Sequence, residues 1–371
     1  MNTARVVIAT VSVSLCAVAA PAQVPIQTRV AFFSETYSFD PGLIFQRINE
    51  YTVPVGITVP IGDKGEVALS TGYAHVVLRS ADRQQLADQK LSGFLDTEAR
   101  VSWNVIPGRL TVLATGAIPT GITTVSGDEL SVLGALASDI IGFVSPSVGS
   151  GGRVGLGFAG AVPIGSWAIG LGATVREAFR YTAVTGSTSP LKPGREVRVR
   201  GGVEGRLGQR TYVRAATIYS YRAKDLKGDS TQNGIGNRIV GYLSINQGIG
   251  NTSLFVYGFD VWRGSPQLEE TALGAAVLPR GNLIGVGMSW FLPITRHVSV
   301  TPRGELRNSA QDSPLQLAGR SLRGGVDLRY QITPRFAVVG QAGGVSGFLV
   351  QESERIHFDG LRTAIHVEWT P

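Results

Sequence analysis

The sequence predicts an all-β fold, a transmembrane antiparallel β-barrel of about sixteen strands, with about fourteen possible, and one short helix in the longest loop. Runs of alternating polar and apolar residues recur along the 371 residues, and the connections between them alternate between short turns and long loops. Bacterial outer-membrane barrels have this alternation, with short periplasmic turns and long outer loops. After the N-terminus, no apolar run approaches the roughly 20 residues of a membrane-spanning helix.

The N-terminal residues 1–22 read as a signal peptide. Arg5 provides a positive charge, an apolar stretch follows, and Ala22 ends an A-x-A cleavage site. The single cysteine, Cys16, lies in this segment, so neither thiol chemistry nor a disulfide is expected in the exported chain. No linker or shift in composition divides the remainder, which predicts one outer-membrane barrel domain over residues 23–371.

The predicted strands share a pattern in which apolar side chains alternate with polar ones. In the strand 195–207, Val197 and Val203 lie on one face, and Arg198 and Glu204 lie on the other. We assign the polar face to a wet lumen and the apolar face to lipid. The predicted strands cover residues 28–39, 46–60, 65–79, 92–105, 109–119, 152–162, 166–181, 195–207, 210–223, 236–248, 251–263, 281–292, 296–308, 320–331, 335–349 and 359–369.

Tryptophans distinguish a membrane barrel from a soluble β-sandwich. Most of them lie close to a short turn or to the C-terminus. Core aromatics of a soluble domain would be expected in the middle of strands, whereas membrane barrels place aromatic girdles at the lipid interface. The predicted periplasmic girdle consists of Trp103, Trp167, Trp290 and Trp369.

Several motifs give the chain a family resemblance. Pro119, Thr120 and Gly121 lead into the longest loop, the turn at 163–167 has the sequence PIGSW, and glycines alternate with apolar residues in the hairpin 155–172. In these features the chain resembles the Gly-rich outer-membrane channel proteins grouped with phenol meta-pathway and long-chain fatty-acid transporters. The resemblance implies a channel for hydrophobic or aromatic compounds. The fatty-acid transporters begin with a hatch domain for which we expect no room here, so a hatch-based route is not implied.

The longest loop contains the one segment with clear helical periodicity. Residues 126–143 are predicted to form a helix, in which Ser126 and Glu129 make an S-x-x-E capping box and Gly142 offers a stop. The apolar stripe of this helix consists of Leu130, Leu133, Gly134, Ala137 and Ile141.

The two strands after this loop have unusually small residues on their predicted lumen face. Small residues let another element approach a sheet closely. We therefore expect the helix to fold inward, to lay its stripe against this wall and to narrow the pore, with an outer lid as the alternative. The wall consists of Gly155, Gly157, Ala159, Ala161, Ala168, Gly170 and Gly172.

Arginine dominates the charges that are predicted to face the lumen, and the chain has a formal net charge of +7. Rings of arginine favour anions. Arginine–carboxylate ladders that merely brace the barrel would give the same pattern, so both interpretations stay open. Because these arginines alternate with apolar residues, a nucleic-acid partner is not expected. The predicted lumen residues include Arg198, Arg200, Arg206, Arg214, Arg303, Arg307, Arg323 and Arg329, beside Asp96, Glu204, Asp260 and Glu305.

No motif predicts catalysis, a metal or a cofactor. The histidines have no metal-ligand spacing, His75 is expected to point outward near the rim, and no G-x-S-x-G elbow is present. The first interpretation is therefore an outer-membrane channel for passive or facilitated passage of small solutes, hydrophobic, aromatic or anionic. Its expected partners are outer-membrane lipid and these solutes. A non-transporting structural or surface-interaction barrel is the alternative, and a barrel hydrolase is a less favoured one.

Overall fold

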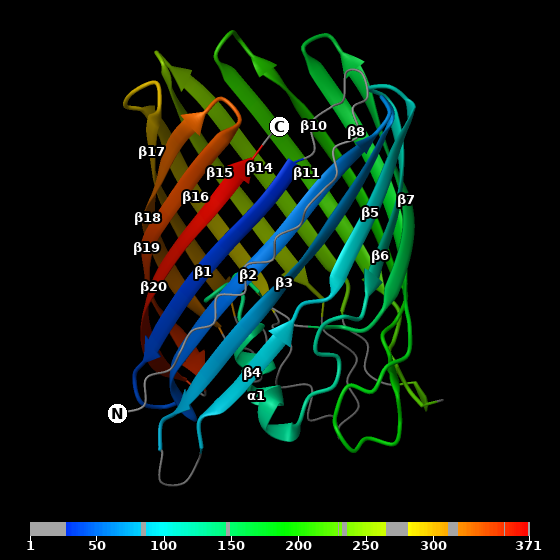
Figure 1. The fold of residues 1–371 in the computed structure, drawn as a ribbon, viewed down its shortest axis with the longest axis vertical. Helices are drawn as coiled ribbons and strands as arrows, with labels where there is room; N and C mark the ends of the chain where they lie inside the picture. Colours follow the sequence, from blue (N-terminus) through cyan, green and yellow to red (C-terminus); the bar gives the residue numbers. More distant parts are fainter. Residues whose placement is uncertain are drawn as a thin grey trace.

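The computed structural model describes residues 27–82, 87–145, 149–228, 230–231, 236–264, 281–310, 318–351 and 353–369. Its main sheet closes on itself, because β1 (Gln27–Phe39) pairs antiparallel with the last strand, β20 (Glu354–Trp369). Two of the 17 strands, β4 (Gln89–Phe94) and β5 (Thr97–Ile106), pair in succession with β3 (Gly65–Ser80) and count as one, which leaves 16 around the barrel (Figure 1). The predicted sixteen-stranded barrel is confirmed. The predicted signal peptide lies outside the described residues.

The other strands follow one another around the barrel in chain order, each antiparallel to its neighbours. A separate small sheet joins β9 (Leu191–Lys192), β12 (Leu226–Lys227) and β13 (Ser230–Thr231). The remaining barrel strands are β2 (Phe45–Ile61), β6 (Leu110–Ile118), β7 (Arg153–Ile164), β8 (Trp167–Ala178), β10 (Glu196–Leu207), β11 (Thr211–Arg222), β14 (Arg238–Ile249), β15 (Thr252–Arg263), β16 (Asn282–Pro293), β17 (Val298–Ala310), β18 (Ala318–Thr333) and β19 (Phe336–Gln351).

Two strand predictions are wrong in detail. The predicted strand 92–105 is interrupted between β4 and β5, where the chain turns the Asp96 carboxylate towards the longest loop. Most of the predicted outer loop 350–358 is strand instead, because β19 runs to Gln351 and β20 begins at Glu354; Ser353 between them has a φ of 76°. Phe348 contacts both Arg355 and His357 on the opposite strand, and such cross-strand pairs extend this hairpin beyond its predicted length.

Large apolar side chains cover the outer face of the barrel. Leu156, Leu171 and Leu322 are 70, 59 and 61% exposed. Exposed apolar side chains occur singly on most proteins, but here they recur on alternate residues of strand after strand. The barrel therefore presents a continuous apolar belt on its outside. Within the described ranges, no helix combines the length and hydropathy needed to cross a membrane.

The main apolar cluster of the inner face lies towards the end that carries the long loops. There, inward side chains of β1, β2, β3, β4 and β20 form a cluster with residues of the longest loop, as in the core of a soluble domain. The fully buried members contributed by the wall include Tyr37, Ile48, Val76, Leu91, Ile356 and Phe358.

Candidate pore constriction

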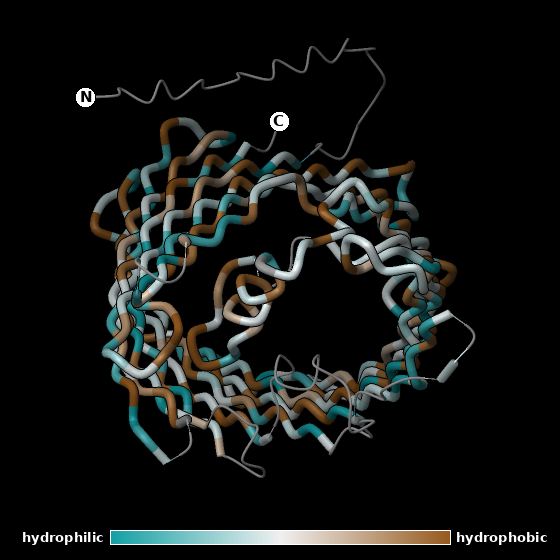
Figure 2. Tube along the Cα trace, turned by 90° about the horizontal axis from the view of Figure 1, so that it is seen from below, coloured by the Kyte–Doolittle hydropathy of each residue, from teal (hydrophilic) through white to brown (hydrophobic). Residues whose placement is uncertain are grey.

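The helix α1 (Gly127–Leu136) lies inside the barrel, in the half that carries the long loops (Figures 1 and 2). Its predicted capping box is present. The Ser126 hydroxyl accepts the Glu129 N–H at 3.4 Å, and the Glu129 carboxylate accepts the Ser126 N–H at 2.7 Å. These bonds satisfy backbone donors that a helix start otherwise leaves unpaired. We call residues 125–145 the docked segment.

The helix ends earlier than predicted, at Leu136 rather than near Phe143. After it the chain makes one further turn, in which the Gly142 N–H donates to the Ser138 carbonyl at 2.7 Å and Gly142 has a φ of 56°. The carbonyl groups of this turn accept hydrogen bonds from the barrel wall instead of continuing the helix. Tertiary contacts therefore override the local helix propensity.

The buried stripe of the helix differs from the predicted one. Val132 and Leu136 of the helix, and Ile140 in the turn that follows it, are at most 2% exposed, whereas Leu130, which the prediction placed in the stripe, is 38% exposed. Two adjacent rows of this helix are apolar, so a 3.6-residue period alone does not decide which row faces the wall. Of the predicted residues, Ile141 is buried and Leu133 packs against the buried cluster.

The predicted seat of the helix is wrong. α1 contacts β4 and β3 rather than the small-residue wall of β7 and β8. The physical reason is the inward apolar cluster, because a buried Val, Leu or Ile side chain contributes about 1.5–3 kcal/mol when it leaves water. A wall of glycine and alanine permits close approach, but it offers little apolar surface to bury.

Arginines and a serine of β17 and β18 hold the carbonyl groups of the docked segment. Arg307 Nη1 donates to the Asp139 carbonyl at 2.8 Å, and Ser321 Oγ donates to the Ile140 carbonyl at 2.9 Å. Arg323 Nη2 donates to the same carbonyl at 3.1 Å and also to that of Ile141. A fifth contact, from β15, is the ion pair between Arg263 and Asp139.

Two buried carboxylates hold the next amides of the segment. Glu35 Oε2 accepts the Val144 N–H at 2.9 Å, and Glu50 Oε1 accepts the Ser145 N–H at 3.1 Å. Both glutamates are at most 1% exposed. A buried charge is costly unless it is hydrogen-bonded, so these bonds stabilise the glutamates and the segment together.

Asp96 joins the two ends of the longest loop. Its Oδ1 accepts the Gly121 N–H at 3.2 Å, and its Oδ2 accepts the Ser150 N–H at 2.8 Å. One carboxylate therefore fixes the positions at which the loop enters and leaves the barrel. The break between β4 and β5 places Asp96 for this role.

The small-residue wall lines an open part of the lumen. A cavity of about 530 Å³ lies against Ala159, Ala161, Ala168 and Gly170, with the charged residues Arg200, Glu204 and Arg214 at its side. The wall thus leaves space in the barrel that the helix does not fill.

Most of the predicted lumen arginines have acidic partners. Arg198 pairs with Glu196 at 2.5 Å, Arg214 with Glu204 at 2.6 Å and Arg303 with Asp327 at 3.3 Å. Arg307 pairs with Glu305 at 2.6 Å and Arg329 pairs with Glu368. Among the described residues, Arg200 and Arg206 have no carboxylate within 4.0 Å. The carboxylates partly balance the arginines, as a bracing ladder would.

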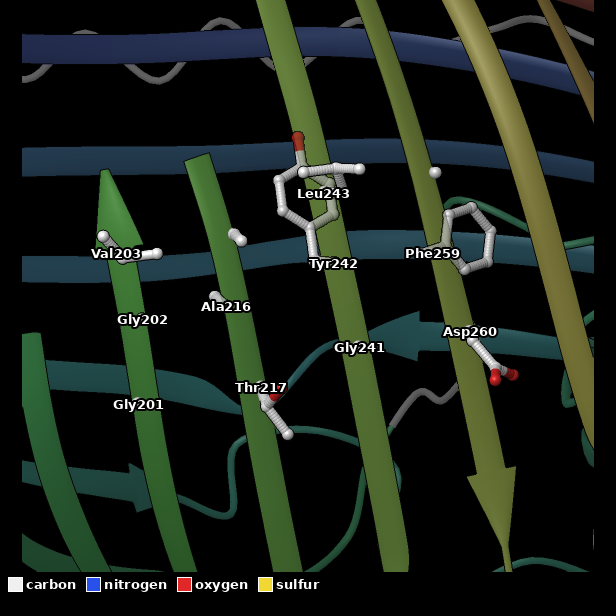
Figure 3. Close-up of a pocket in the computed structure, with 12 residues that line it drawn as sticks. Gly201, Gly202, Val203, Ala216, Thr217, Gly241, Tyr242, Leu243, Phe259 and Asp260 are labelled. Carbon is white, nitrogen blue, oxygen red and sulfur yellow. The ribbon is translucent and has the colours of Figure 1, made fainter. Parts of the chain in front are cut away.

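Asp260 is not a lumen residue, contrary to the prediction. It lies directly across from Ile284, which is 47% exposed on the outer face, and it shares its side of β15 with Trp262. Figure 3 shows Asp260 at one end of a hollow in the outer surface, beside Gly241 and Thr217, with β1 to β3 behind the wall.

The four predicted girdle tryptophans lie at the end of the barrel that carries the short turns. Trp167 and Trp369 are the first and last residues of their strands. Trp103 and Trp290 lie three residues before the ends of β5 and β16 and are 43 and 42% exposed. Their rings therefore face outward at one level of the barrel.

One Ser–His pair occurs on the outer face. His75 Nδ1 and Ser92 Oγ are 2.5 Å apart on neighbouring strands, and the His75 ring stacks on Tyr51. In the described residues, no carboxylate or amide side chain contacts this histidine. The described part of the chain also contains no group of three or more potential metal ligands. The pair therefore lacks the third group that orients a catalytic histidine.

Sequence reasoning missed Glu35, Glu50, Ser321 and Arg263, the residues that hold the docked segment. A signal was available near the first two. Strands β1, β2 and β3 carry apolar residues on both faces towards their long-loop ends, at Tyr37, Ile48 and Val76 among others. In a barrel, an apolar inner face requires something to cover it.

No protein-family model and no curated protein sequence matches the chain. Solved structures with a similar fold include a BenF-like porin from Pseudomonas fluorescens Pf-5, with 8% identity over 94% of this chain and 98% of that one and a TM-score of 0.49. OccK11 (OpdR) of Pseudomonas aeruginosa has 11% identity over 94 and 96% and a TM-score of 0.47. The outer membrane channel DcaP of Acinetobacter baumannii has 10% identity over 96 and 100% and a TM-score of 0.46.

Proposed function

We propose that this chain is an outer-membrane channel for passive or facilitated passage of small solutes, narrowed by the docked segment. The observation that carries the proposal is the network around residues 139–145. Side chains from β1, β2, β17 and β18 hold the segment inside a barrel that keeps a cavity along its opposite wall. A fixed inner segment beside an open path is suited to selecting solutes by size and charge.

The outer surface supports a membrane location. It carries an apolar belt with tryptophans at one end, and export by a signal peptide would bring such a barrel to the outer membrane. A barrel of about sixteen strands leaves an aqueous interior wide enough for a channel. Outer-membrane lipid is therefore the proposed partner of the outer face.

The inner surface supports the proposal that the permeating solutes are small organic or anionic compounds. Its arginines exceed the carboxylates that pair with them, and it also carries aromatic rings such as Tyr257 and Phe33. Passage of aromatic compounds, which the likeness to phenol meta-pathway and fatty-acid transporters implies, is part of this proposal. We propose no enzymatic activity, because the Ser92–His75 pair lacks an orienting group.

Single-channel recording in planar bilayers tests the proposal. We expect the purified protein to insert and conduct, and deletion of residues 127–142 to raise the conductance, because the segment occupies part of the lumen. Unchanged conductance in a correctly folded deletion variant would contradict the constriction. A folded protein that never conducts would favour a structural or surface-interaction barrel instead.

A further inference from the structure

We propose that a cavity beside the docked segment binds the carboxylate of a small organic monoanion on its way through the channel; this inference rests on the proposed function. The cavity has a volume of about 190 Å³ and is bounded by inward residues of β15, β17, β18, β19 and β20. It adjoins the turn at residues 139–141, because Arg307 and Arg323 both line it and both bind that turn. A solute that passes the segment on this side meets the cavity.

Four guanidinium groups converge on this cavity, from Arg303, Arg307, Arg323 and Arg362. Two of their donors, Arg323 Nε and Arg362 Nε, are buried and make no hydrogen bond. The carboxylate oxygens with which they pair, of Glu305 and Glu35, lie 3.8 and 3.5 Å away. A buried donor without a partner is unfavourable, and an arginine fork matches the two oxygens of a carboxylate. A carboxylate in the cavity would add a hydrogen-bond acceptor for guanidinium groups whose present ion pairs are long.

The charge balance favours a monoanion. Glu305 lies in the cavity and pairs with Arg307 at 2.6 Å, Asp327 pairs with Arg303 at 3.3 Å, and Glu35 lies 3.5 Å from Arg362. The four arginines that line the cavity outnumber the three carboxylates paired with them by one. One carboxylate balances this excess, whereas a phosphate dianion would leave a negative excess in a partly buried place.

The remaining lining favours an organic anion. Val345 and the Tyr257 ring provide apolar surface, and Gly343 and Gly344 leave space beside them. The Tyr257 hydroxyl donates to Glu305, so its ring is held in position. A planar or short apolar body fits this lining better than a hydrated inorganic ion does.

Arg303 is the residue through which the proposal can be tested. Its side chain is 38% exposed, against 14% for Arg323. Arg307 and Arg323 donate hydrogen bonds to carbonyl groups of the docked segment, whereas Arg303 makes no such bond to the described residues of that segment. Arg214 is a matched control, because it also faces the lumen and also pairs with one carboxylate, but it lies on β11, four strands away from β17 around the barrel. The test variants are therefore Arg303→Gln and Arg214→Gln.

The experiment adds benzoate to single channels that conduct KCl. Phenol serves as the uncharged ring and inorganic phosphate as the dianion. We expect benzoate to block the current of the parent protein. The half-blocking concentration of benzoate should rise about tenfold in Arg303→Gln and change less than twofold in Arg214→Gln. Phenol should block none of the three proteins. Equal benzoate block in all three proteins, or stronger block by phosphate than by benzoate, would overturn the proposal.

Calorimetric titration of the folded protein in detergent with benzoate separates this inference from the proposed function. If the protein does not conduct but binds benzoate in an Arg303-dependent manner, the channel function fails and the site stands. If the protein conducts but the titration shows no binding, or binding that Arg303→Gln leaves unchanged, the site is wrong and the channel stands.

Discussion

Glu35 and Glu50 lie opposite each other on β1 and β2, and each accepts one backbone N–H of the docked segment. Two neighbouring carboxylates repel each other and lose hydration when they are buried. Tyr37 and Thr52 donate hydrogen bonds to them at 3.0 and 2.7 Å, and Arg362 lies 3.5 Å from Glu35. The barrel wall thus carries two buried glutamates, and the backbone amides that donate to them belong to the docked segment, which we propose narrows the pore.

Removal of this pair should loosen the segment. In the double variant Glu35→Ala/Glu50→Ala, the amides of Val144 and Ser145 lose charged acceptors, each worth about 1.5–3 kcal/mol. We expect faster hydrogen exchange in residues 139–145 and a noisier, larger single-channel current. Glu66→Ala is the control, because Glu66 also faces the lumen but pairs with Arg100 at 2.8 Å. Identical current noise in the two variants would contradict an anchoring role.

The Asp96 carboxylate yields a separate prediction about the loop ends. Asp96→Ala removes the acceptor shared by Gly121 and Ser150, so both ends of the loop should exchange amide hydrogen faster. Glu98, which lies in β5 two residues after Asp96, pairs with Arg153 and serves as the control. We expect hydrogen exchange measured by mass spectrometry to increase around residues 121 and 150 in Asp96→Ala only. An equal increase in Glu98→Ala would point to general loosening of β5.

The two rows of the helix provide a matched pair of variants. Leu136→Ala empties a site that is 1% exposed and should destabilise the docked segment by about 2–5 kcal/mol. Leu130→Ala changes a residue that is 38% exposed and should cost about 0.5 kcal/mol or less. Protection of the α1 amides from hydrogen exchange measures both. A larger loss of protection in Leu130→Ala than in Leu136→Ala would mean that the predicted stripe seats the helix, and an equal loss would mean that neither row alone does.

Much of the barrel was predictable because a strand with one wet and one apolar face alternates at every residue. The short turns between strands carry Gly and Pro signals, and Trp103 and Trp290 marked one rim. The capping box at Ser126 and Glu129 is equally local, and it is present. Each of these features depends on a few neighbouring residues, which is the information that one sequence contains.

The seat of the helix was not predictable in the same way. Its position depends on Glu35, Glu50 and Ser321, which are more than 90 residues away from the segment in the chain. Small residues on β7 and β8 suggested close approach, but the gain from apolar burial lay on β1 to β4, and burial decided the outcome. Asp260 shows the limit of parity, since an error of one residue moves a side chain from lumen to outer face.

Gly142 allows the segment to turn beneath the arginines, and its replacement gives the last prediction. Gly142 has a φ of 56°, and an added Cβ would lie 2.3 Å from Arg307 Nη1 and 2.8 Å from Arg323 Nη2. Gly142→Ala should therefore strain the backbone by about 1 kcal/mol and displace both guanidinium groups from the carbonyls they bind. Gly340→Ala is the control, because its Cβ would meet no atom within 4 Å. We expect Gly142→Ala alone to alter single-channel conductance and to lower the protection of residues 139–141 from hydrogen exchange. If both variants behave like the parent protein, the arginine contacts do not hold the segment.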